Sequence, residues 1–167
     1  MVTPPPKPYR PRNKRLDREL YARANWITFV TVCALRPAAP FVAEGFNQDL
    51  IETLRACQPK DSCLVYTYCL MPDHLHYLVS PQVEGASVLT FTERFKGRVT
   101  PVARRFGWRG KLWQERYYDH IVRMDEDLRQ IAIYILNNPV RKGLVERAED
   151  WQWGGHMNPL PVNPAAP

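Results

Sequence analysis

The first half of the chain alternates between stretches with the period of a strand and one stretch with the period of a helix. Residues 26–33 (WITFVTVC) are rich in β-branched and aromatic side chains, which favours a strand. Residues 46–57 (FNQDLIETLRAC) carry apolar side chains three and four positions apart, which predicts an amphipathic helix. Residues 62–71 and 74–80 predict two more strands, and the Pro-Asp pair between them predicts the turn of a hairpin.

The second half predicts a helix, a strand and a last helix. Ser87 is the expected N-cap of the first helix, and Pro101 is expected to kink or end it. Residues 116–124 predict a fourth strand. The last helix is predicted at residues 126–137, with Asp125 as its N-cap.

The order of these elements predicts the fold class. Pro139 is expected to stop the last helix, because the residue before a proline avoids the helical region. The order is then strand, helix, strand, strand, helix, strand and a final helix. Its first six elements match the split βαβ, or ferredoxin-like, arrangement. We therefore predict an α+β fold, with an antiparallel sheet and helices packed on it.

Composition divides the 167 residues into one folded unit and two ends. The first stretch is rich in proline and in basic residues, and the last is rich in proline without apolar periodicity. Such ends bury too little apolar surface to fold alone. We expect a disordered arm over residues 1–17, one domain over residues 18–156 and a tail over residues 157–167.

The net charge of +6 is concentrated in two segments. Residues 87–123 hold nine Lys or Arg against three Asp or Glu, and the arm adds five basic residues and no acid before residue 16. A concentrated basic charge favours a polyanionic partner, either nucleic acid or an anionic membrane surface, although solubility is the plainer alternative.

The cysteines and the apolar runs bear on the compartment. Cys33, Cys57, Cys63 and Cys69 form no CxxC pair and lie in apolar stretches, which indicates buried thiols in a reducing cytosol. No apolar run approaches the ~18 residues that cross a membrane. The N-terminus lacks the apolar core of a signal peptide. The sequence therefore predicts a cytoplasmic protein.

Two histidines are candidate metal ligands. His74 and His76 lie two residues apart on a predicted strand, so their side chains point to one face while Leu75 and Tyr77 point to the other. Two imidazoles held in this way can share one metal ion. The same His-x-His pattern also occurs in strands that bind no metal.

A tyrosine and an asparagine on the last predicted helix are candidate partners of that ion. Tyr134 and Asn138 are four residues apart and so share a helical face. The amide oxygen of Asn138 would be a third ligand, which leaves open positions for a substrate oxygen. A nearby cation would help Tyr134 to act as a nucleophile. Packing for the tyrosine and a helix stop for the asparagine are the structural alternatives.

These motifs together resemble a known family. MPDHLHYLVS is similar to the HUH motif (His, hydrophobic, His) of single-strand DNA endonucleases and transposases. FKGRVT, KLWQERYYDHIVR and YILNNPVRKGLV resemble Y1 transposases of the IS200/IS605 kind. The nearer resemblance is to REP-associated tyrosine transposases, bacterial relatives that accompany repeated extragenic palindromes. It spans about residues 16–153, and the combination of motifs is more specific than HUH alone.

The resemblance implies an activity and the residues for it. His74 and His76 are the implied metal ligands, Tyr134 the single nucleophile, and Asn138 stands where the transposases often carry a glutamine as third ligand. In the implied transesterification, Tyr134 attacks a phosphodiester of single-stranded DNA, a 5′-phosphotyrosyl bond forms and a 3′-hydroxyl leaves. The implied cofactor is Mg²⁺ or Mn²⁺, without a nucleotide cofactor. The implied location is the bacterial cytoplasm, associated with the nucleoid.

The implied partner is single-stranded or hairpin DNA of a repeat, held mainly through its phosphates. A monomer is expected, with a dimer as the alternative. Trp108 is flanked by basic residues and would either stack on an unpaired base or pack on the core. The predicted DNA-binding residues are Arg10, Arg12, Lys14, Arg15, Arg94, Lys96, Arg98, Arg104, Arg105, Trp108, Arg109, His120 and Arg123.

Other interpretations stay open from the sequence. Tyr117 and Tyr118 are rival nucleophiles, although adjacent strand residues face opposite sides and one of the two is expected to pack. A hairpin DNA-binding protein of the same fold that does not cleave is the second functional class. A small metalloenzyme is a third, but it leaves the basic segment unexplained.

Overall fold

Five strands form one antiparallel sheet in the computed structural model, which describes residues 15–35 and 38–162. Their order across the sheet is β4-β1-β3-β2-β5, and the first four follow the predicted ferredoxin-like arrangement. Every pairing is antiparallel. The strands are β1 (Thr28–Cys33), β2 (Cys63–Met71), β3 (His74–Pro81), β4 (Tyr118–Ile121) and β5 (Gly154–His156).

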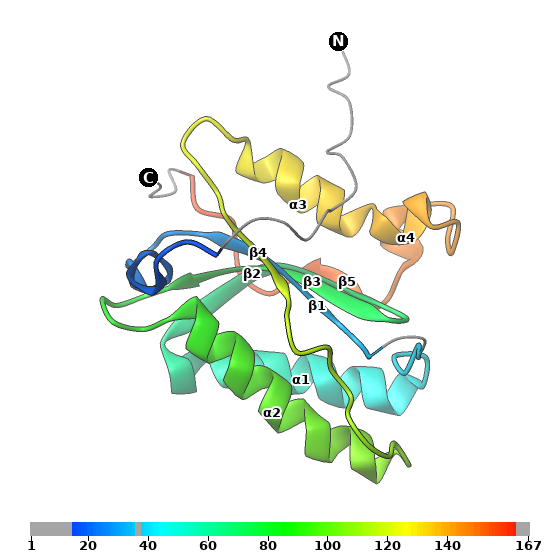
Figure 1. Cartoon of the computed structure of the whole chain (residues 1–167). Helices are drawn as coiled ribbons and strands as arrows, with labels where there is room; N and C mark the ends of the chain where they lie inside the picture. Colours follow the sequence, from blue (N-terminus) through cyan, green and yellow to red (C-terminus); the bar gives the residue numbers. More distant parts are fainter. Residues whose placement is uncertain (1–14, 36–37, 163–167) are drawn as a thin grey trace.

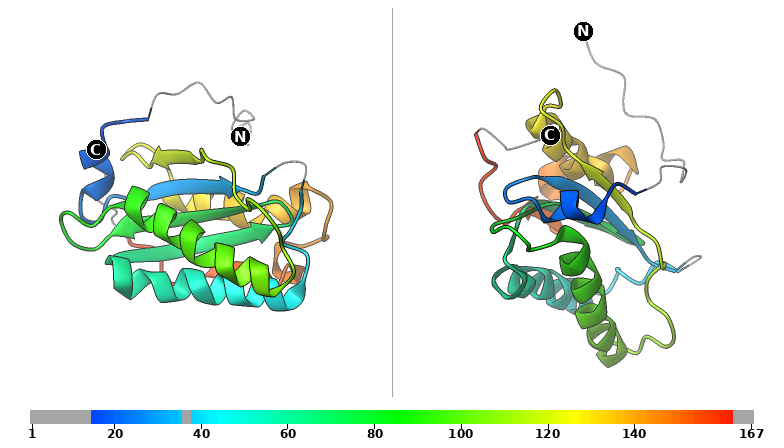
Figure 2. Two further views of the ribbon diagram at one scale, coloured as in Figure 1. Left: turned by 60° about the horizontal axis from the view of Figure 1, so that its bottom comes forward. Right: turned by 60° about the vertical axis from the view of Figure 1, so that its left-hand side comes forward.

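Helices cover both faces of this sheet (Figure 1). The two long helices, α1 (Glu44–Asp61) and α2 (Val88–Arg105), lie side by side on one face, as both views of Figure 2 also show. On the opposite face lie α3 (Leu128–Leu136) and the short α4 (Asn138–Arg141). Two short 3-10 helices, Arg18–Ala22 and Ala148–Asp150, complete the described elements. The predicted α+β fold class is confirmed.

Strand alternation divides the apolar side chains between two cores. Val30 and Tyr77 face α1 and α2 and belong to the larger core. Ile27 and Leu78 face α3 and belong to a smaller core. Because both faces are covered, β3 is buried along most of its length, unlike a strand with one wet face. The smaller core positions α3 over the face that carries the histidines.

Pro101 does not end its helix, whereas α3 ends shortly before Pro139, as the sequence predicts. Pro101 lies inside α2, which continues to Arg105, so the expected end there is wrong. A proline removes one backbone hydrogen bond from a helix, but Val99 and Ala103 bury the same helix against the larger core and offset that loss. Pro139 lies in the first turn of α4, where a backbone N–H would have no partner within the helix, so its absence costs no hydrogen bond.

The last predicted helix differs at both ends. It begins at Leu128, and its N-cap is Asp127 rather than Asp125. The Asp127 carboxylate accepts hydrogen bonds from the backbone N–H groups of Arg129 (2.9 Å) and Gln130 (3.3 Å). The helix α3 ends at Leu136, close to the predicted end at about Asn137. A second short helix starts at Asn138, so Tyr134 and Asn138 lie on two helices and not on one helical face as predicted.

Two further features were not predicted. The strand β5 pairs with the outer edge of β2 over residues 67–69 of β2. The helix α1 runs four residues past its predicted end, to Asp61, and Ser62 ends it in the left-handed conformation with φ of 50°. Within the described residues, no helix is long and apolar enough to span a membrane.

Candidate active site

The two histidines of β3 face each other on the side of the sheet that α3 covers. His76 is paired with Thr31 of β1 and Cys69 of β2, in the interior of the sheet. The Nε2 atoms of His74 and His76 are 3.0 Å apart, and the ring planes are tilted by 74°. Leu75 and Tyr77 lie in the opposite core, so the predicted alternation is confirmed.

The second nitrogen of each ring contacts an oxygen. Nδ1 of His74 is 2.6 Å from Oδ1 of Asp73, and Nδ1 of His76 is 2.7 Å from Oγ1 of Thr31. With Nδ1 as the proton donor in both contacts, each Nε2 keeps its lone pair and directs it at the other ring. Two lone pairs this close repel each other, and a cation bound between them would remove that repulsion.

The spacing of the two rings fits a divalent ion. Ligands 2.1 Å from an octahedral ion and at right angles to each other lie about 3.0 Å apart, which matches the observed separation of 3.0 Å between the Nε2 atoms of His74 and His76. His76 is only 8% exposed. Burial, then the charges of His74 and Arg141, lower the pKa of His76 well below its usual value, so its imidazole stays neutral as metal ligation requires.

Asn138 is the first residue of α4 and is 5% exposed. Its Nδ2 has no hydrogen-bond partner among residues 15–35 and 38–162. An unsatisfied buried amide indicates that a further polar group belongs beside it. The described residues hold no group of three His, Cys, Asp or Glu that could bind a metal ion, so a third protein ligand would have to be a side chain of another kind.

Tyr134 lies on α3, half-buried, on the same face of the sheet as the histidines. Its ring is 6.3 Å from the ring of Phe29, which is itself 5.5 Å from the ring of His76. The guanidinium carbon of Arg141 is 4.4 Å above the ring of Tyr134. Phe29 and Arg141 thus connect the phenol with the histidine pair.

Sequence reasoning missed both connecting residues. Phe29 is two positions from Thr31, so strand alternation alone places it on the histidine face. Arg141 stands in the YILNNPVRKGLV motif, but its position over Tyr134 depends on the change of direction between α3 and α4. No periodicity in the sequence signals that change.

The two rival nucleophiles, Tyr117 and Tyr118, face opposite sides of the sheet, as predicted. Tyr117 faces the larger core and is 8% exposed. Tyr118 pairs with Thr31 across the sheet, and its ring is 5.7 Å from the ring of Phe29. The prediction that one of them packs is confirmed for Tyr117, whereas Tyr118 belongs to the same surroundings as Tyr134.

The helix α2 lies on the face of the sheet opposite α3 (Figure 1), so its basic residues lie on the side away from the histidines. Arg94 and Arg98 bind the two carboxylate oxygens of the buried Asp61, at 2.6 and 2.5 Å. Burial alone would raise the pKa of Asp61, but the hydrogen bonds from Arg98 and Arg94 outweigh it and lower that pKa. These two arginines therefore join α2 to the end of α1.

Two more of the predicted DNA-binding residues on α2 have structural contacts. Lys96 is 8% exposed and donates to the backbone oxygen of Glu115, and burial lowers its pKa. Arg105 pairs with Asp49 at 3.0 Å. Arg104, near the end of the same helix, is exposed.

The remaining predicted DNA-binding residues are dispersed. Arg15 binds Asp119 at 2.6 Å and stacks on the ring of Tyr117, whereas Arg10, Arg12 and Lys14 lie outside the described residues. Tyr21 also donates to Asp119. The last group comprises Trp108, half-buried against the larger core, the exposed Arg109 and Arg123, and His120, whose Nε2 is 2.8 Å from Glu126.

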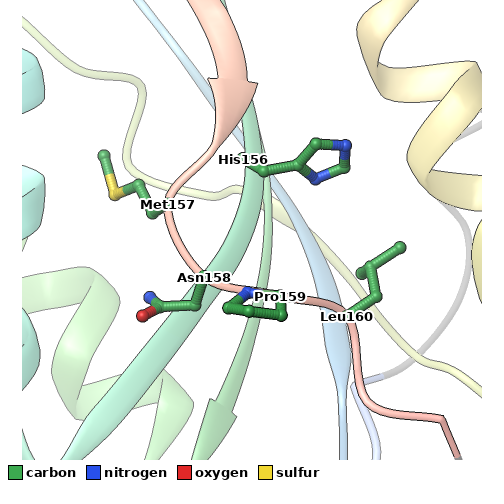
Figure 3. Close-up of a pocket in the computed structure, with 5 residues that line it drawn as sticks. All are labelled: His156, Met157, Asn158, Pro159 and Leu160. Carbon is green, nitrogen blue, oxygen red and sulfur yellow. The ribbon is translucent and has the colours of Figure 1, made fainter.

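A shallow pocket of about 430 Å³ lies elsewhere, along the segment after β5 (Figure 3). His156 and Leu160 extend to one side of this segment, and Met157 and Asn158 to the other. Asn158 donates to the backbone oxygen of Val65 at 2.6 Å, which holds the segment on the sheet. Neither histidine of the pair lines this pocket, so the candidate site lies elsewhere.

Comparison with known proteins supplies a family. The sequence model described as "Transposase IS200 like" matches residues 24–138 of this chain. That range contains both histidines, Tyr134 and Asn138. It excludes the segment that forms β5.

Curated relatives cover much of the chain. A Haemophilus influenzae protein provisionally named a REP-associated tyrosine transposase is 28% identical over 125 residues, 66% of this chain and 70% of its own. A second, uncharacterised H. influenzae protein is 32% identical over 160 residues, 77% of this chain and 88% of its own. The REP-associated tyrosine transposase of Escherichia coli K12 is 28% identical over 87 residues, 52% of this chain and 50% of its own.

A solved structure shares the fold. It is that of a REP-associated tyrosine transposase bound to a REP hairpin, and it aligns with a TM-score of 0.69 at 22% identity. The alignment covers 85% of this chain and 82% of that chain. The ferredoxin-like sheet with its covering helices is therefore shared with that protein.

Proposed function

We propose that this chain, which belongs to the family of IS200-like transposases, cuts and rejoins single-stranded DNA through a covalent bond to Tyr134. One observation carries the proposal. Tyr134 lies on the same face of the sheet as the pair of histidines proposed as metal ligands. Both Tyr134 and His76 contact the ring of Phe29. A phenol beside a cation site is the arrangement that a tyrosine nucleophile requires.

The proposed substrate is a hairpin of repeat DNA. A relative of the same fold is bound to a REP hairpin, and two curated relatives are named for REP association. The chain is basic, with a net charge of +6, which suits phosphate contacts. Exposed cations at Arg104, Arg109 and Arg123 are the proposed contacts on the described surface.

His74, His76 and Asn138 are the proposed ligands of Mg²⁺ or Mn²⁺. When bound, the ion would act as a Lewis acid on a phosphate oxygen. Asp73 and Thr31 fix the protonated ring nitrogen of each histidine and so prepare both Nε2 atoms for binding. Asn138, shorter than a glutamine, would bind directly or through a water molecule.

The proposed reaction exchanges one phosphoester bond for another. The phenolic oxygen of Tyr134 forms a bond to phosphorus, and the bond from phosphorus to the 3′-oxygen breaks. The phenolic proton passes to water, and the departing 3′-oxygen takes a proton from water. The products are a 5′-phosphotyrosyl bond and a 3′-hydroxyl, which can reverse the step without a nucleotide cofactor.

The oligomeric state and the location of the protein stay predictions: a monomer in the cytoplasm, associated with the nucleoid.

A covalent adduct tests this proposal. End-labelled hairpin oligonucleotides with single-stranded flanks, taken from the repeats beside the gene, are incubated with the protein in Mg²⁺ or Mn²⁺ and run on a denaturing gel. We expect an adduct with the unaltered protein and with Tyr118→Phe, and none with Tyr134→Phe, with His76→Ala or with EDTA. Tyr118→Phe is the matched control because Tyr118 also contacts Phe29.

Two results would contradict the proposal in different ways. An adduct that persists in Tyr134→Phe and disappears in Tyr118→Phe would reassign the nucleophile. Tight hairpin binding without any adduct, in either metal, would favour the hairpin-binding protein that does not cleave.

A further inference from the structure

We propose that Arg141 is a further catalytic residue, whose guanidinium binds a non-bridging oxygen of the phosphate that Tyr134 attacks. This inference rests on the proposed function. It adds a role that neither the histidine pair nor Asn138 supplies. The substrate group concerned is the phosphodiester itself, independent of base sequence.

The position of Arg141 carries the inference. Its guanidinium carbon lies 4.4 Å above the centre of the Tyr134 ring. The ring of Tyr134 in turn contacts Phe29, whose ring is 5.5 Å from the ring of His76. A cation stacked on the proposed nucleophile lies close to where the attacked phosphate would be bound.

The charge of Arg141 is available to an anion. Within residues 15–35 and 38–162, Arg141 forms no ion pair with a carboxylate, and its side chain is exposed. Other arginines of the chain do have such partners: Arg15, Arg94, Arg98, Arg105 and Arg147 each contact an Asp. The guanidinium over Tyr134 therefore retains N–H donors for a ligand.

The local fold explains why Arg141 occupies this position. The helix α3 ends at Leu136, and α4 starts again at Asn138 with Pro139 in its first turn. The backbone N–H of Arg141 donates to Asn137 at 3.0 Å, and Gly143 ends the turn with φ of 68°. This short turn directs Arg141 back over the preceding tyrosine.

The chemistry requires a second positive group. A phosphodiester has two non-bridging oxygens, and charge on them has to be stabilised while phosphorus binds five oxygens. A bound ion would act on one oxygen, and Arg141 is proposed to bind the other. Arginine suits this role because its guanidinium stays charged and holds several N–H donors in a fixed plane. The stacking on Tyr134 orients the guanidinium before the substrate arrives.

Adduct formation on three substrates tests the inference. The hairpin carries a phosphodiester, or one of the two separated methylphosphonate diastereomers, at the cleaved linkage. Arg141→Ala is compared with Lys142→Ala, which removes an equal charge from the next exposed residue. Single-turnover rates are measured at saturating hairpin concentration.

We expect Arg141→Ala to slow adduct formation on the phosphodiester by about 10²–10³-fold, the usual effect of removing one oxyanion donor. Lys142→Ala should stay within about 3-fold of the unaltered protein. On the diastereomer whose methyl group replaces the oxygen that Arg141 binds, Arg141→Ala and the unaltered protein should react at similar rates. Arg141→Lys should fall between the two on the phosphodiester, because it keeps the charge and loses the planar set of donors.

Three outcomes would overturn the role of Arg141 and leave the proposed function standing. These are a rate of Arg141→Ala close to that of Lys142→Ala on the phosphodiester, an equal loss on all three substrates, or no reaction of the unaltered protein with either methylphosphonate. Unchanged thermal unfolding and Mn²⁺ affinity of the variant show that it is folded, and Arg141→Lys serves in its place if it is not. Failure of the unaltered protein to form any adduct would instead overturn the proposed function, and this inference with it.

Discussion

At the scale of single residues, Asp73 and Thr31 each contact the Nδ1 atom of one histidine of the pair, His74 and His76 respectively. The two contacts differ in kind, because Asp73 offers a carboxylate and Thr31 offers a hydroxyl that can donate or accept. A carboxylate can only accept, so it fixes the tautomer of His74 more firmly. Asp73 is therefore a positioning residue for the proposed metal site.

Asp73→Asn should weaken Mn²⁺ binding by about 10-fold, at the lower end of the range for loss of a group that supports a metal ligand. Asparagine preserves the preference for a turn at this position. The dissociation constant is measured by calorimetry or by the electron paramagnetic resonance of free Mn²⁺. Asp125→Asn removes the same charge from a loop away from the histidines and is the control. Equal Mn²⁺ affinity of Asp73→Asn and the unaltered protein would contradict this role.

The buried His76 gives stability a dependence on pH. Burial, His74 and Arg141 lower its pKa well below the usual value, so below about pH 6.5 the unfolded chain binds a proton that the folded chain does not. This contribution to stability is present above about pH 6.5 and is lost as the pH falls, by up to about 1.4 kcal/mol per pH unit. In metal-free buffer, urea unfolding at pH 5.0 and 7.5 should show a smaller pH effect for His76→Gln. An identical pH effect in both proteins would contradict it.

The cap of α3 matters at the scale of elements, because this helix carries Tyr134. Asp127→Ala should lower the free energy of unfolding by about 1 kcal/mol, since two backbone N–H groups lose their acceptor. The residue that the sequence favoured as the cap, Asp125, is the matched control, and Asp125→Ala should leave that free energy within about 0.5 kcal/mol. Urea unfolding measures both. A larger effect at Asp125 would contradict the cap seen in the structure.

The elements themselves were predictable to different degrees. Strand composition in WITFVTVC and HLHYLV sufficed for β1 and β3, because these strands lie at the centre of the sheet and their pattern reflects burial. The choice between Asp125 and Asp127 depends on which start lets Leu128, Ala132 and Ile135 face the sheet. That choice is tertiary and leaves no local signal.

At the scale of the whole molecule, the histidine pair and much of the basic charge lie in different places. The histidine pair lies on the α3 face, whereas much of the basic segment lies on the α2 face, where Arg94 and Arg98 are bound to Asp61. A count of basic residues therefore overstates the surface available to DNA. Sequence reasoning could locate the excess charge but not the internal pairing of those arginines.

The salt dependence of hairpin binding shows which arginines contact phosphates of the DNA. If Arg104 contacts a phosphate, Arg104→Ala should reduce the slope of log affinity against log salt by about 1 for hairpin binding. Arg94→Ala should leave the slope closer to its original value and instead destabilise the fold, because Asp61 loses a partner. Binding titrations at several salt concentrations, with unfolding curves of both variants, distinguish the two effects. An unchanged slope for Arg104→Ala would remove that residue from the contact surface.

The candidate site also shows where sequence reasoning stops across the whole chain. The motif pairs His74 with His76, and strand geometry suffices to put both on one face. Phe29 and Arg141 join that pair to Tyr134 from opposite ends of the chain. Contacts between segments so far apart follow from the topology of the sheet, which a pattern of hydrophobic and polar residues only outlines.

The small strand β5 has a consequence for the behaviour of shortened chains. It pairs with the outer edge of the nine-residue β2, and the indole of Trp151 donates to the backbone of Leu70 beside it. A chain that stopped before Trp151 would leave that edge unpaired, with main-chain donors and acceptors free to recruit another copy. Self-association into sheet-rich aggregates would then compete with folding. We therefore expect the segment from Trp151 to His156 to protect the chain from aggregation, although it lies beyond the matched transposase region.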